Sequence, residues 1–487
     1  MSLTRRSFLK RSLAAAAGVT IAGTKSSGRV LGANDTIRIA VAGLNGRGGA
    51  HVGAWTGMKG VELVYLIDPD TRTYDGRLKQ VAGKGRKEPQ VIKDVRPALD
   101  DKTLDALSIA TPNHWHALMT LWGCQAGKDV YVEKPCSHNI HEGRIAVEAA
   151  RKYSRIVQHG TQNRSRQDFA DVVAAIKSGK LGRLLVSRGL CYKSTLRGGL
   201  GTRGSIGYAK PTDPPAALDF NLWLGPAAEQ AYHSNLVPYR WHWFWDFGNG
   251  DIGNQGVHEM DKARWVIPNA TLPRSVFSLG GRLGYRDQGQ TPSSQIAVFD
   301  YGETQLIFEV RGLPSKGYLG EQVGNICHLE AGTIVDTKFF PKGSDKPAPL
   351  PRIEGAERRG PGAGDHFANF IEAVRSRQTG DLNAPVIEGH YSAALCHLAN
   401  MSYRLGQEVP FNPRTKAFGD NKDAYESLAR MEDYLKENHV NLEETKYQLG
   451  RKLTVDAHSE TIVGDPEATK LLSRSYRKPF VVPEKLG

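Results

Sequence analysis

Residues Thr36–Gly49 read TIRIAVAGLNGRGG, a short apolar run that passes directly into a glycine-rich turn. The run Thr36–Ala42 predicts a buried strand, because it is brief, apolar and followed at once by turn residues. Three further runs of this kind follow, at Val61–Ile67, Leu104–Ala110 and Asp129–Val132. Segments with helical spacing lie between and after them, at His116–Ala126 and Glu142–Tyr153. Alternating strands and helices predict a doubly wound parallel α/β sheet that ends near residue 158.

The turn after the first strand has the spacing of a dinucleotide-binding fingerprint. Gly43 and Gly48 match the first and last glycines of G-x-G-x-x-G, and Asn45 stands where the middle glycine belongs. Glycine lets the backbone approach a pyrophosphate closely, and the helix that follows offers free N–H groups and a favourable dipole. Asparagine departs only mildly from the template, since it tolerates left-handed dihedral angles. We predict cofactor contacts from Gly43, Asn45, Gly46, Arg47 and Gly48; a glycine-rich turn without a ligand is the alternative.

The second predicted strand is followed at once by Asp68. A carboxylate there accepts hydrogen bonds from the ribose hydroxyls of an adenosine and repels a 2′-phosphate, which favours NAD over NADP. The alternative is an aspartate that only begins a turn with Pro69. A glycine turn and an acidic strand end on consecutive strands together predict NAD as the cofactor.

The composition indicates a folded protein with more than one domain. The chain has 487 residues, of which 40% are hydrophobic and 24% charged, so it is long for one core and too apolar for disorder. Beyond Gln162, strand-like stretches such as Ser293–Tyr301 are joined by loops, and helices are expected at Asp365–Arg375 and Val386–Leu405. This predicts an α+β domain with a mostly antiparallel open sheet. The expected divisions are a leader (1–33), a Rossmann domain (34–158), an α+β substrate and oligomerisation domain (159–415) and a packed extension (416–487).

The net charge of +13 is concentrated at one end of the chain. Residues 1–33 hold six basic residues and no acidic one, and the remaining charges are interspersed. A nucleic-acid surface gathers its positive charge on one face, so we expect no nucleic-acid partner. Thr4–Lys10 (TRRSFLK) precedes a mildly apolar stretch at Leu13–Gly23, which is typical of a twin-arginine export signal with Ala33 as a cleavage edge. We expect export by that machinery to the periplasm or another extracytoplasmic place; a basic disordered tail is the alternative.

Neither a membrane anchor nor a metal site is expected. Mean hydropathy is -0.42, and the sequence has no apolar run of about 18 residues. The five cysteines form no C-x-x-C pair, so burial as small apolar residues is expected. His114 and His116 have the spacing of a metal pair without a third ligand, which favours a structural or cofactor-pocket role.

Two turns and the C-terminal tail carry a resemblance to a known family. Thr111–His116 (TPNHWH) follows one strand and Glu133–Pro135 (EKP) follows the next, ahead of the α+β domain. With the tail from Val463 to Phe480, which looks like the extension of exported bacterial members, the chain resembles the Gfo/Idh/MocA family, the glucose–fructose oxidoreductase and inositol dehydrogenase group. The resemblance implies a lysine beside the nicotinamide and the substrate hydroxyl, here Lys134. It also implies cofactor contacts from the two turns, here Thr111, Pro112, Asn113, His116, Glu133 and Lys134.

The family's second catalytic cluster reads D-x-x-x-H-x-x-D, and the matching run here is Asn254–Asp261. Spacings of four and three residues place Asn254, His258 and Asp261 on one helical face. The resemblance implies His258 as a base or hydrogen-bond partner for a substrate hydroxyl, and Asp261 as the last acid. Asn254 stands where an inositol-type dehydrogenase has aspartate, and an amide orients a hydroxyl without taking its proton, so the proton goes to His258 or Lys134. The predicted catalytic residues are Lys134, Asn254, His258 and Asp261.

Three of the eight tryptophans lie in Tyr239–Phe247, which reads YRWHWFWDF. Aromatic faces suit the C–H faces of a sugar ring, and packing beneath the glycine-rich residues 248–256 is an equal alternative. The predicted substrate-binding residues are Arg164, Tyr239, Arg240, Trp241, Trp243, Asn254 and His258.

Three functions fit these patterns. The first is NAD-dependent oxidation of a sugar, polyol or sugar derivative at a C–OH carbon. Export would remove the enzyme from the cytoplasmic NAD pool, so the second is a redox-neutral enzyme with tightly bound NAD, acting between two sugars or in NAD-assisted glycoside cleavage. The third is a carbohydrate-binding protein without activity, against which Lys134 and His258 argue. The resemblance also implies a homo-oligomer formed through the open sheet.

Overall fold

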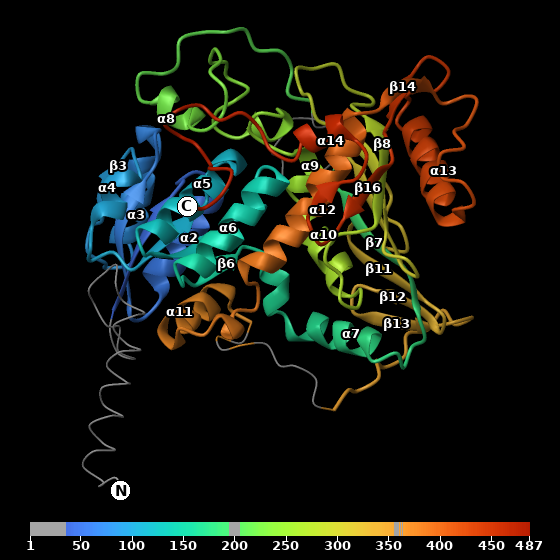
Figure 1. Cartoon of the computed structure of the whole chain (residues 1–487), viewed down its shortest axis with the longest axis horizontal. Helices are drawn as coiled ribbons and strands as arrows, with labels where there is room; N and C mark the ends of the chain where they lie inside the picture. Colours follow the sequence, from blue (N-terminus) through green and yellow to red (C-terminus); the bar gives the residue numbers. More distant parts are fainter. Residues whose placement is uncertain (1–35, 194–204, 355–359, 361, 363) are drawn as a thin grey trace, which may run out of the picture.

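The structure, a computed structural model, describes residues 36–193, 205–354, 360, 362 and 364–487. The expected export signal lies outside these residues. Two sheets stand at opposite ends of the molecule, the first among the blue and cyan helices and the second on the far side of α10 and α12 (Figure 1). Within the described residues, none of the helices is both long and apolar enough to cross a membrane.

The first sheet has six parallel strands in the order β3-β2-β1-β4-β5-β6. Their bounds are β1 Ile37–Ala42, β2 Val61–Ile67, β3 Gln90–Ile92, β4 Ala106–Ile109, β5 Asp129–Val132 and β6 Val157–His159. The helices between them are α2 Arg47–Gly57, α3 Tyr74–Ala82, α4 Arg96–Asp100, α5 Asn113–Gln125 and α6 Ile140–Lys152, with a 3-10 turn η1 at Thr71–Thr73. The predicted doubly wound fold is confirmed. The strand order reverses between β1 and β4, and ligands of such sheets bind in the crevice at the carboxyl ends of these strands.

The second sheet follows the order β13-β12-β11-β7-β10-β9-β8-β15-β14, and β16 pairs with β8 and β17 beside this path. Strand β7 runs parallel to β10, whereas the other pairings along this path are antiparallel, as predicted. The strands are β7 Leu184–Tyr192, β8 Ser275–Gly281, β9 Ser294–Asp300, β10 Gln305–Arg311, β11 Val323–Leu329, β12 Gly332–Val335, β13 Lys338–Pro341, β14 Gln407–Pro410, β15 Lys446–Leu449, β16 Leu453–Asp456 and β17 Thr461–Ile462.

Helices cover both faces of this second sheet. On one face Met260 of α10 (Gly256–Trp265) and Leu398 of α12 (Val386–Arg404) pack with Phe308 of β10. On the other face Leu435 of α13 (Lys422–Glu437) packs with Ile307, the neighbour of Phe308. Consecutive residues of β10 therefore point to opposite cores, as the pleat of a strand requires. The remaining elements are η2 Gln162–Ser165, α7 Gln167–Lys177, α8 Phe220–Leu224, η4 Arg240–Trp243, α9 Gly250–Gly253, α11 His366–Ser376, η5 Thr379–Asp381 and α14 Pro466–Lys470.

Packing crosses the expected domain divisions in two places. Helix α11 was expected in the second domain, but Phe370 and Val374 belong to the core cluster of Ile39 and Trp55 beside the first sheet. The residues after α14 cross the molecule to the first domain, where the red trace ends (Figure 1). There Phe480 is 2% exposed and packs against the ring of Trp115.

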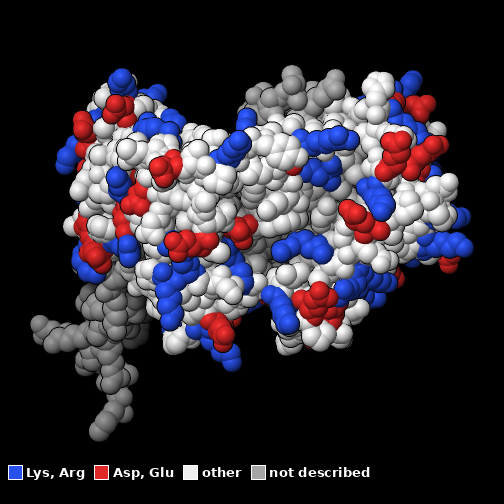
Figure 2. All heavy atoms as spheres, turned by 90° about the horizontal axis from the view of Figure 1, so that it is seen from above, with Lys and Arg blue, Asp and Glu red and all other residues white. Residues whose placement is uncertain are grey.

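The described surface mixes the two signs of charge. In the view of Figure 2, basic and acidic side chains lie next to one another over most of the visible face, without a continuous basic stripe.

Candidate active site

The glycine turn after β1 is built so that its backbone faces outward with little side-chain cover. Gly43 has φ +84°, and a Cβ there would lie 2.5 Å from the backbone of Ala110, while a Cβ on Gly48 would lie 1.9 Å from the Gly43 oxygen. Gly46 also has a positive φ, and nothing lies within 4 Å of where its Cβ would be. The Asn45 side chain caps this turn by accepting the Gly46 N–H at 2.9 Å. A phosphate group therefore has steric access to the start of α2 at Gly46, whose own N–H is bonded to Asn45.

Asp68 lies where the sequence predicts it, and its carboxylate accepts hydrogen bonds from two backbone N–H groups. Its two oxygens accept the N–H groups of Leu44 at 2.8 Å and Asp70 at 2.9 Å. Burial raises the pKa of Asp68 to about 6, against the opposing effect of these two hydrogen bonds. Asp68 therefore fastens the glycine turn to the loop after β2.

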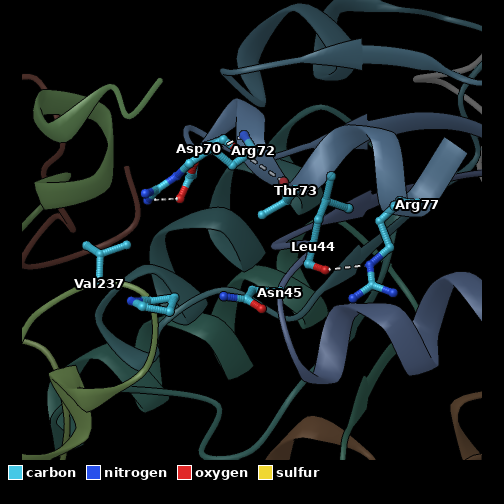
Figure 3. A pocket seen from close by; sticks show the side chains of 9 residues that line it. Leu44, Asn45, Asp70, Arg72, Thr73, Arg77 and Val237 are labelled. Carbon is cyan, nitrogen blue, oxygen red and sulfur yellow. Dashed lines mark hydrogen bonds and ion pairs between the residues drawn. The ribbon is translucent and has the colours of Figure 1, made fainter. Parts of the chain in front are cut away.

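A cavity of about 400 Å³ lies beside this loop, at the end of the crevice where the adenosine of a dinucleotide would lie. Figure 3 shows its walls, which come from the glycine turn, the β2–α3 loop and the distant Val237 and Pro238. Its lining residues are Leu44, Asn45, Asp70, Arg72, Thr73, Gly76, Arg77, Val237 and Pro238.

Glu133 anchors a buried network between α2 and the end of β5. Its Oε1 accepts Arg47 Nε at 2.7 Å and contacts His51 Nε2 at 3.1 Å. Burial opposes ionisation, but His51 and Arg47 together hold the pKa of Glu133 well below its usual value. The other ring nitrogen of His51 lies 2.8 Å from Ser108 Oγ on β4. Sequence reasoning missed His51, although it lies one helical turn after Arg47.

The two turns that carry the family resemblance are tied together by His116. Its Nδ1 lies 2.6 Å from the Pro135 oxygen and its Nε2 lies 2.8 Å from the Thr111 oxygen. Pro112 precedes the first residue of α5, which is Asn113, and both Asn113 and His116 are buried. The turn at 111–113 is thereby held against the peptide that follows Lys134. Among the described residues no group of three His, Cys, Asp or Glu side chains is arranged to hold a metal ion.

Lys134 reaches from the first domain to the second. Its Nζ donates to the Asn254 backbone oxygen at 2.9 Å and to Asn254 Oδ1 at 3.3 Å. Burial and the positive charge of Lys193 lower the pKa of Lys134 to about 8, although Glu133 pulls in the other direction. Because burial disfavours its charged form, this amine titrates below the ordinary lysine range.

His258 lies in α10, whereas Asn254 follows the end of α9, so the predicted single helical face through both residues is wrong. Burial and the Lys134 charge hold the pKa of His258 well below its usual value. Its ring is therefore neutral at pH 7, and its Nδ1 has no hydrogen-bond partner among the described residues. A neutral imidazole with an unused nitrogen is able to accept a proton or orient a hydroxyl.

Asp261 and Arg164, predicted for catalysis and substrate binding, are paired with one another. Arg164 Nε donates to the two Asp261 oxygens at 3.0 and 2.8 Å, and Ser392 Oγ donates to Asp261 Oδ1 at 2.7 Å. The side chain of Asp261 is 0% exposed and that of Arg164 is 4% exposed. Arg164 also pairs with Glu388 at 3.1 Å. The structure thus places both residues in a brace between α10, η2 and α12.

Most of the aromatic segment is packed. Trp241 and Trp243 are 6% and 2% exposed and belong to a cluster with Trp223 and Phe247. Arg240 donates to the Ile206 oxygen and to Asn235 Oδ1. Tyr239, 42% exposed, has surface left for a ligand. The packing alternative therefore describes both tryptophans.

Sequence reasoning also missed charged neighbours of Lys134. Lys193 directly follows β7 and lowers the pKa of Lys134. Burial, together with the charges of both lysines, holds the pKa of His242 well below its usual value. Glu259, beside His258 in the chain, has a pKa raised to about 7 by burial. Nothing in the sequence placed Lys193 near Lys134.

The two sheets and the turns at the strand ends define a two-domain protein with a dinucleotide-binding domain. Residues 37–161 match the oxidoreductase family model GFO_IDH_MocA, described as an NAD-binding Rossmann fold, and residues 203–277 match its C-terminal alpha/beta domain. Both matched segments are thus similar to Gfo/Idh/MocA oxidoreductases, and the first is an NAD-binding Rossmann domain.

Curated relatives match over the first part of the chain. A Glycosyl hydrolase family 109 protein of Shewanella pealeana is 28% identical over 209 residues, which are 38% of this chain and 45% of that protein. The scyllo-inositol 2-dehydrogenase (NAD(+)) of Bacillus subtilis is 31% identical over 154 residues, which are 31% of this chain and 44% of that protein. The chain thus spans a little under half the length of these relatives.

A solved structure shares the fold over most of the chain. The WlbA dehydrogenase from Bordetella pertussis, in complex with NADH and UDP-GlcNAcA, has a TM-score of 0.55 at 18% identity and covers 76% of this chain and 97% of that one. This likeness is one of fold.

Proposed function

We propose that the protein is an NAD-dependent oxidoreductase that acts on a sugar, polyol or sugar derivative at a C–OH carbon. The observation that carries the proposal is the contact of Lys134 Nζ with Asn254, which brings an amine with a pKa of about 8 to the meeting of the two domains. The dehydrogenase names of the Bacillus subtilis and Bordetella pertussis proteins support the substrate class.

The residues fit a bound dinucleotide. The glycine turn would take its pyrophosphate at the outward-facing backbone near Gly46, and the 400 Å³ cavity would take its adenosine end. The Thr111 turn and the Glu133–Lys134 turn lie at the ends of β4 and β5, where the nicotinamide end belongs. Bound NAD supplies the hydride acceptor for an alcohol carbon.

The chain itself handles the proton. As the C–H hydride leaves the substrate carbon, the O–H proton passes to neutral Lys134 or neutral His258, and a carbonyl group is formed. Asn254 holds the lysine through two oxygens and cannot take the proton itself. Glu133 stays ionised and keeps the adjacent lysine correctly placed.

A second candidate function is a redox-neutral reaction with NAD that stays bound, in which a sugar is oxidised and reduced within one turnover or a glycoside is cleaved. One feature favours it: the loop after β2 is hydrogen-bonded to a distant segment, with Thr71 N to Ala217 O at 3.0 Å and Asp219 N to Pro69 O at 2.9 Å. Trp223 on this segment accepts Trp115 Nε1 of α5 through its oxygen at 3.1 Å. Such ties would slow cofactor exchange. The glycosyl hydrolase name of the Shewanella relative supports cleavage.

The remaining expectations belong to this proposal. Export through the twin-arginine route to the periplasm would follow from the sequence pattern at residues 4–23. A homo-oligomer through the second sheet would follow from the family.

Turnover without added nucleotide separates the two candidates. The purified full chain is given candidate sugars and its products are counted per molecule of protein. Many turnovers without added NAD support the redox-neutral candidate, whereas a single burst of reduced nucleotide that resumes on addition of NAD supports the dehydrogenase. Absence of any product or reduced nucleotide across sugars, polyols and glycosides contradicts both.

A further inference from the structure

One wall of the cavity at the adenosine end belongs to a separately packed part of the chain. Residues 205–247, here called the α8 lobe, contain an apolar cluster of their own, to which Trp223, Val237 and Phe247 belong. A unit whose buried side chains pack with one another is able to move as one body. Figure 3 shows Val237 of this lobe across the cavity from the glycine turn, and Pro238 lines the same wall. The position of the lobe therefore decides how open the cavity is.

The α8 lobe meets the first domain beside this cavity. Its backbone at Ala217 and Asp219 is hydrogen-bonded to the β2–α3 loop, and the Trp223 oxygen accepts Trp115 Nε1 of α5 at 3.1 Å. Leu222 of α8 packs against the core cluster of the first domain. Opening the cavity on the side of the lobe requires these contacts to break.

The C-terminal residues lie across this boundary. Residues 473–482, here called the strap, follow α14 as the red trace that passes beside α8 in Figure 1. Phe480 of the strap is 2% exposed and packs edge-on against the ring of Trp115, with ring centroids 5.3 Å apart. Asn139, which precedes α6, donates through Nδ2 to the Tyr476 hydroxyl at 3.3 Å. The strap is thus anchored on helices of the first domain.

Arg477 joins the strap to the lobe. Its Nη1 donates to Asn221 Oδ1 at 2.6 Å, and its Nη2 donates to the Asn221 backbone oxygen at 2.7 Å. Its Nε donates to the Gly225 oxygen at 3.1 Å, and its backbone N–H donates to the Pro226 oxygen at 3.3 Å. A guanidinium offers several donors in a fixed fork, so one side chain holds α8 and the residues just after it.

Arg474 bridges the same two parts of the molecule. Its Nη1 donates to the Asp246 backbone oxygen of the lobe at 2.8 Å and lies 3.2 Å from Nδ1 of His138, which precedes α6. Neither Arg474 nor Arg477 is among the described residues that line the adenosine-end cavity. The contacts of the strap with the lobe are therefore the same whether or not a nucleotide is bound.

We propose that the strap, chiefly through the positioning residue Arg477, keeps the α8 lobe closed over the adenosine end and slows the exchange of NAD without changing its affinity. A nucleotide enters or leaves while the lobe is open, so both rates follow the share of time that the lobe spends open. Contacts that are equal in the empty and the loaded protein change the two rates by the same factor and leave the dissociation constant unchanged.

This inference rests on the proposed use of NAD and names the part of the chain that retains it. Retention is what the redox-neutral candidate requires, because its nucleotide is reduced and reoxidised without leaving the protein. A dehydrogenase that exchanges its nucleotide at each turnover would instead be slowed by the strap.

The rates of NADH binding and release test the inference without any substrate. The full chain, freed of nucleotide over charcoal, is mixed with NADH in a stopped-flow fluorimeter, and the NADH-loaded protein is chased with excess NAD. Arg477→Gln is expected to raise both rate constants about tenfold, since the guanidinium bonds to the lobe are lost. Their ratio, which is the dissociation constant, is expected to stay at the wild-type value.

Arg451→Gln is the matched control. Arg451 lies in the same C-terminal extension and pairs at 3.0 Å with Asp465 and with Glu467, both outside the α8 lobe. Its two rate constants are expected to equal those of wild type. Asn221→Ala removes one acceptor of Arg477 at an exposed position of the lobe and is expected to raise both rates by a smaller factor. This variant keeps the test decisive if Arg477→Gln does not fold.

Wild-type rates in both Arg477→Gln and Asn221→Ala would overturn the inference. A release rate that rises alone, with affinity weakened in proportion, would overturn it as well, because that pattern indicates lost contacts with the nucleotide rather than faster opening of the lobe. Wild-type protein that binds no NADH contradicts the proposed nucleotide use itself, and the inference falls with it. That failure is seen before any variant is compared.

Discussion

Lys134 and Asp261 both occupy predicted catalytic positions, and their surroundings differ in one respect. The Lys134 ammonium rests on two uncharged oxygens of Asn254, whereas the Asp261 carboxylate faces the Arg164 guanidinium. Burial disfavours the charged form of the Lys134 amine and lowers its pKa to about 8, so this amine is able to exchange its proton near neutral pH. A buried charge matched by an opposite one is fixed. From this comparison we expect the first site to serve proton transfer and the second to hold elements together.

The largest expected effect is the loss of activity in Lys134→Met. The variant keeps the length of the side chain but has no amine to take the proton, so kcat should fall by about 10²–10⁴-fold. The turnover rate with a sugar on which the wild type is active gives the measurement. The unfolding temperature should change little. Lys262→Met is the matched control, since Lys262 is a buried lysine that lies 3.7 Å from Asp336. Equal losses in the two variants would remove the distinction between Lys134 and a structural lysine.

Asp261→Asn should act mainly on stability. It leaves the buried Arg164 guanidinium without its strongest partner, which costs about 3–5 kcal/mol of unfolding free energy. Denaturant unfolding measures this cost. Asp168→Asn is the control, because its pair with Arg166 is largely exposed and contributes about 0–1 kcal/mol. A stable Asp261→Asn protein with lost activity would instead make Asp261 catalytic.

The pH dependence of kcat/KM should report Lys134. Below a pH of about 8 the amine is protonated and has no lone pair for the substrate proton, so activity should rise as pH increases through this value. A pH profile of the free enzyme provides the measurement. The limb should vanish in Lys134→Arg, whose guanidinium stays charged. If kcat/KM instead rose near the ordinary lysine pKa, the pKa of Lys134 would not be lowered in the protein.

Asn254→Asp should give the smallest effect. It would place an opposite charge beside Lys134, as Arg164 is placed beside Asp261. A carboxylate in contact with Lys134 favours the charged amine and raises its pKa by about 1–3 units. The limb of the kcat/KM profile should move upward by that amount, with folding retained. An unmoved limb would mean that a group other than Lys134 controls the profile.

The sequence predicts the elements whose pattern is local. Strand β2 begins and ends at the predicted residues, and the glycine turn has the positive φ at Gly43 that its template requires. Contacts between distant residues have no such pattern. The Arg164–Asp261 pair joins residues 97 positions apart, and helix α11 has the expected periodicity but packs on a different domain from the one predicted.

Asp68 and Asp70 show the same limit on a small scale. Both aspartates follow β2 in the sequence, and the template favours the first. In the structure the Asp68 oxygens accept two backbone N–H groups and Asp70 lies on the cavity wall, contacts that the sequence does not reveal. Trp241 and Trp243 likewise have aromatic rings that suit sugar binding, but both are buried in an apolar cluster.

The most direct measurement is the near-ultraviolet absorbance of reduced nicotinamide when sugars, polyols and glycosides are added to the NAD-loaded protein. Wild type should form reduced nucleotide with at least one of them, either steadily or as a transient within a redox-neutral cycle, and Lys134→Met should form none at a comparable rate. Reduced nucleotide that appears equally fast in both proteins would contradict the claim that Lys134, held by Asn254 at the meeting of the domains, moves the proton.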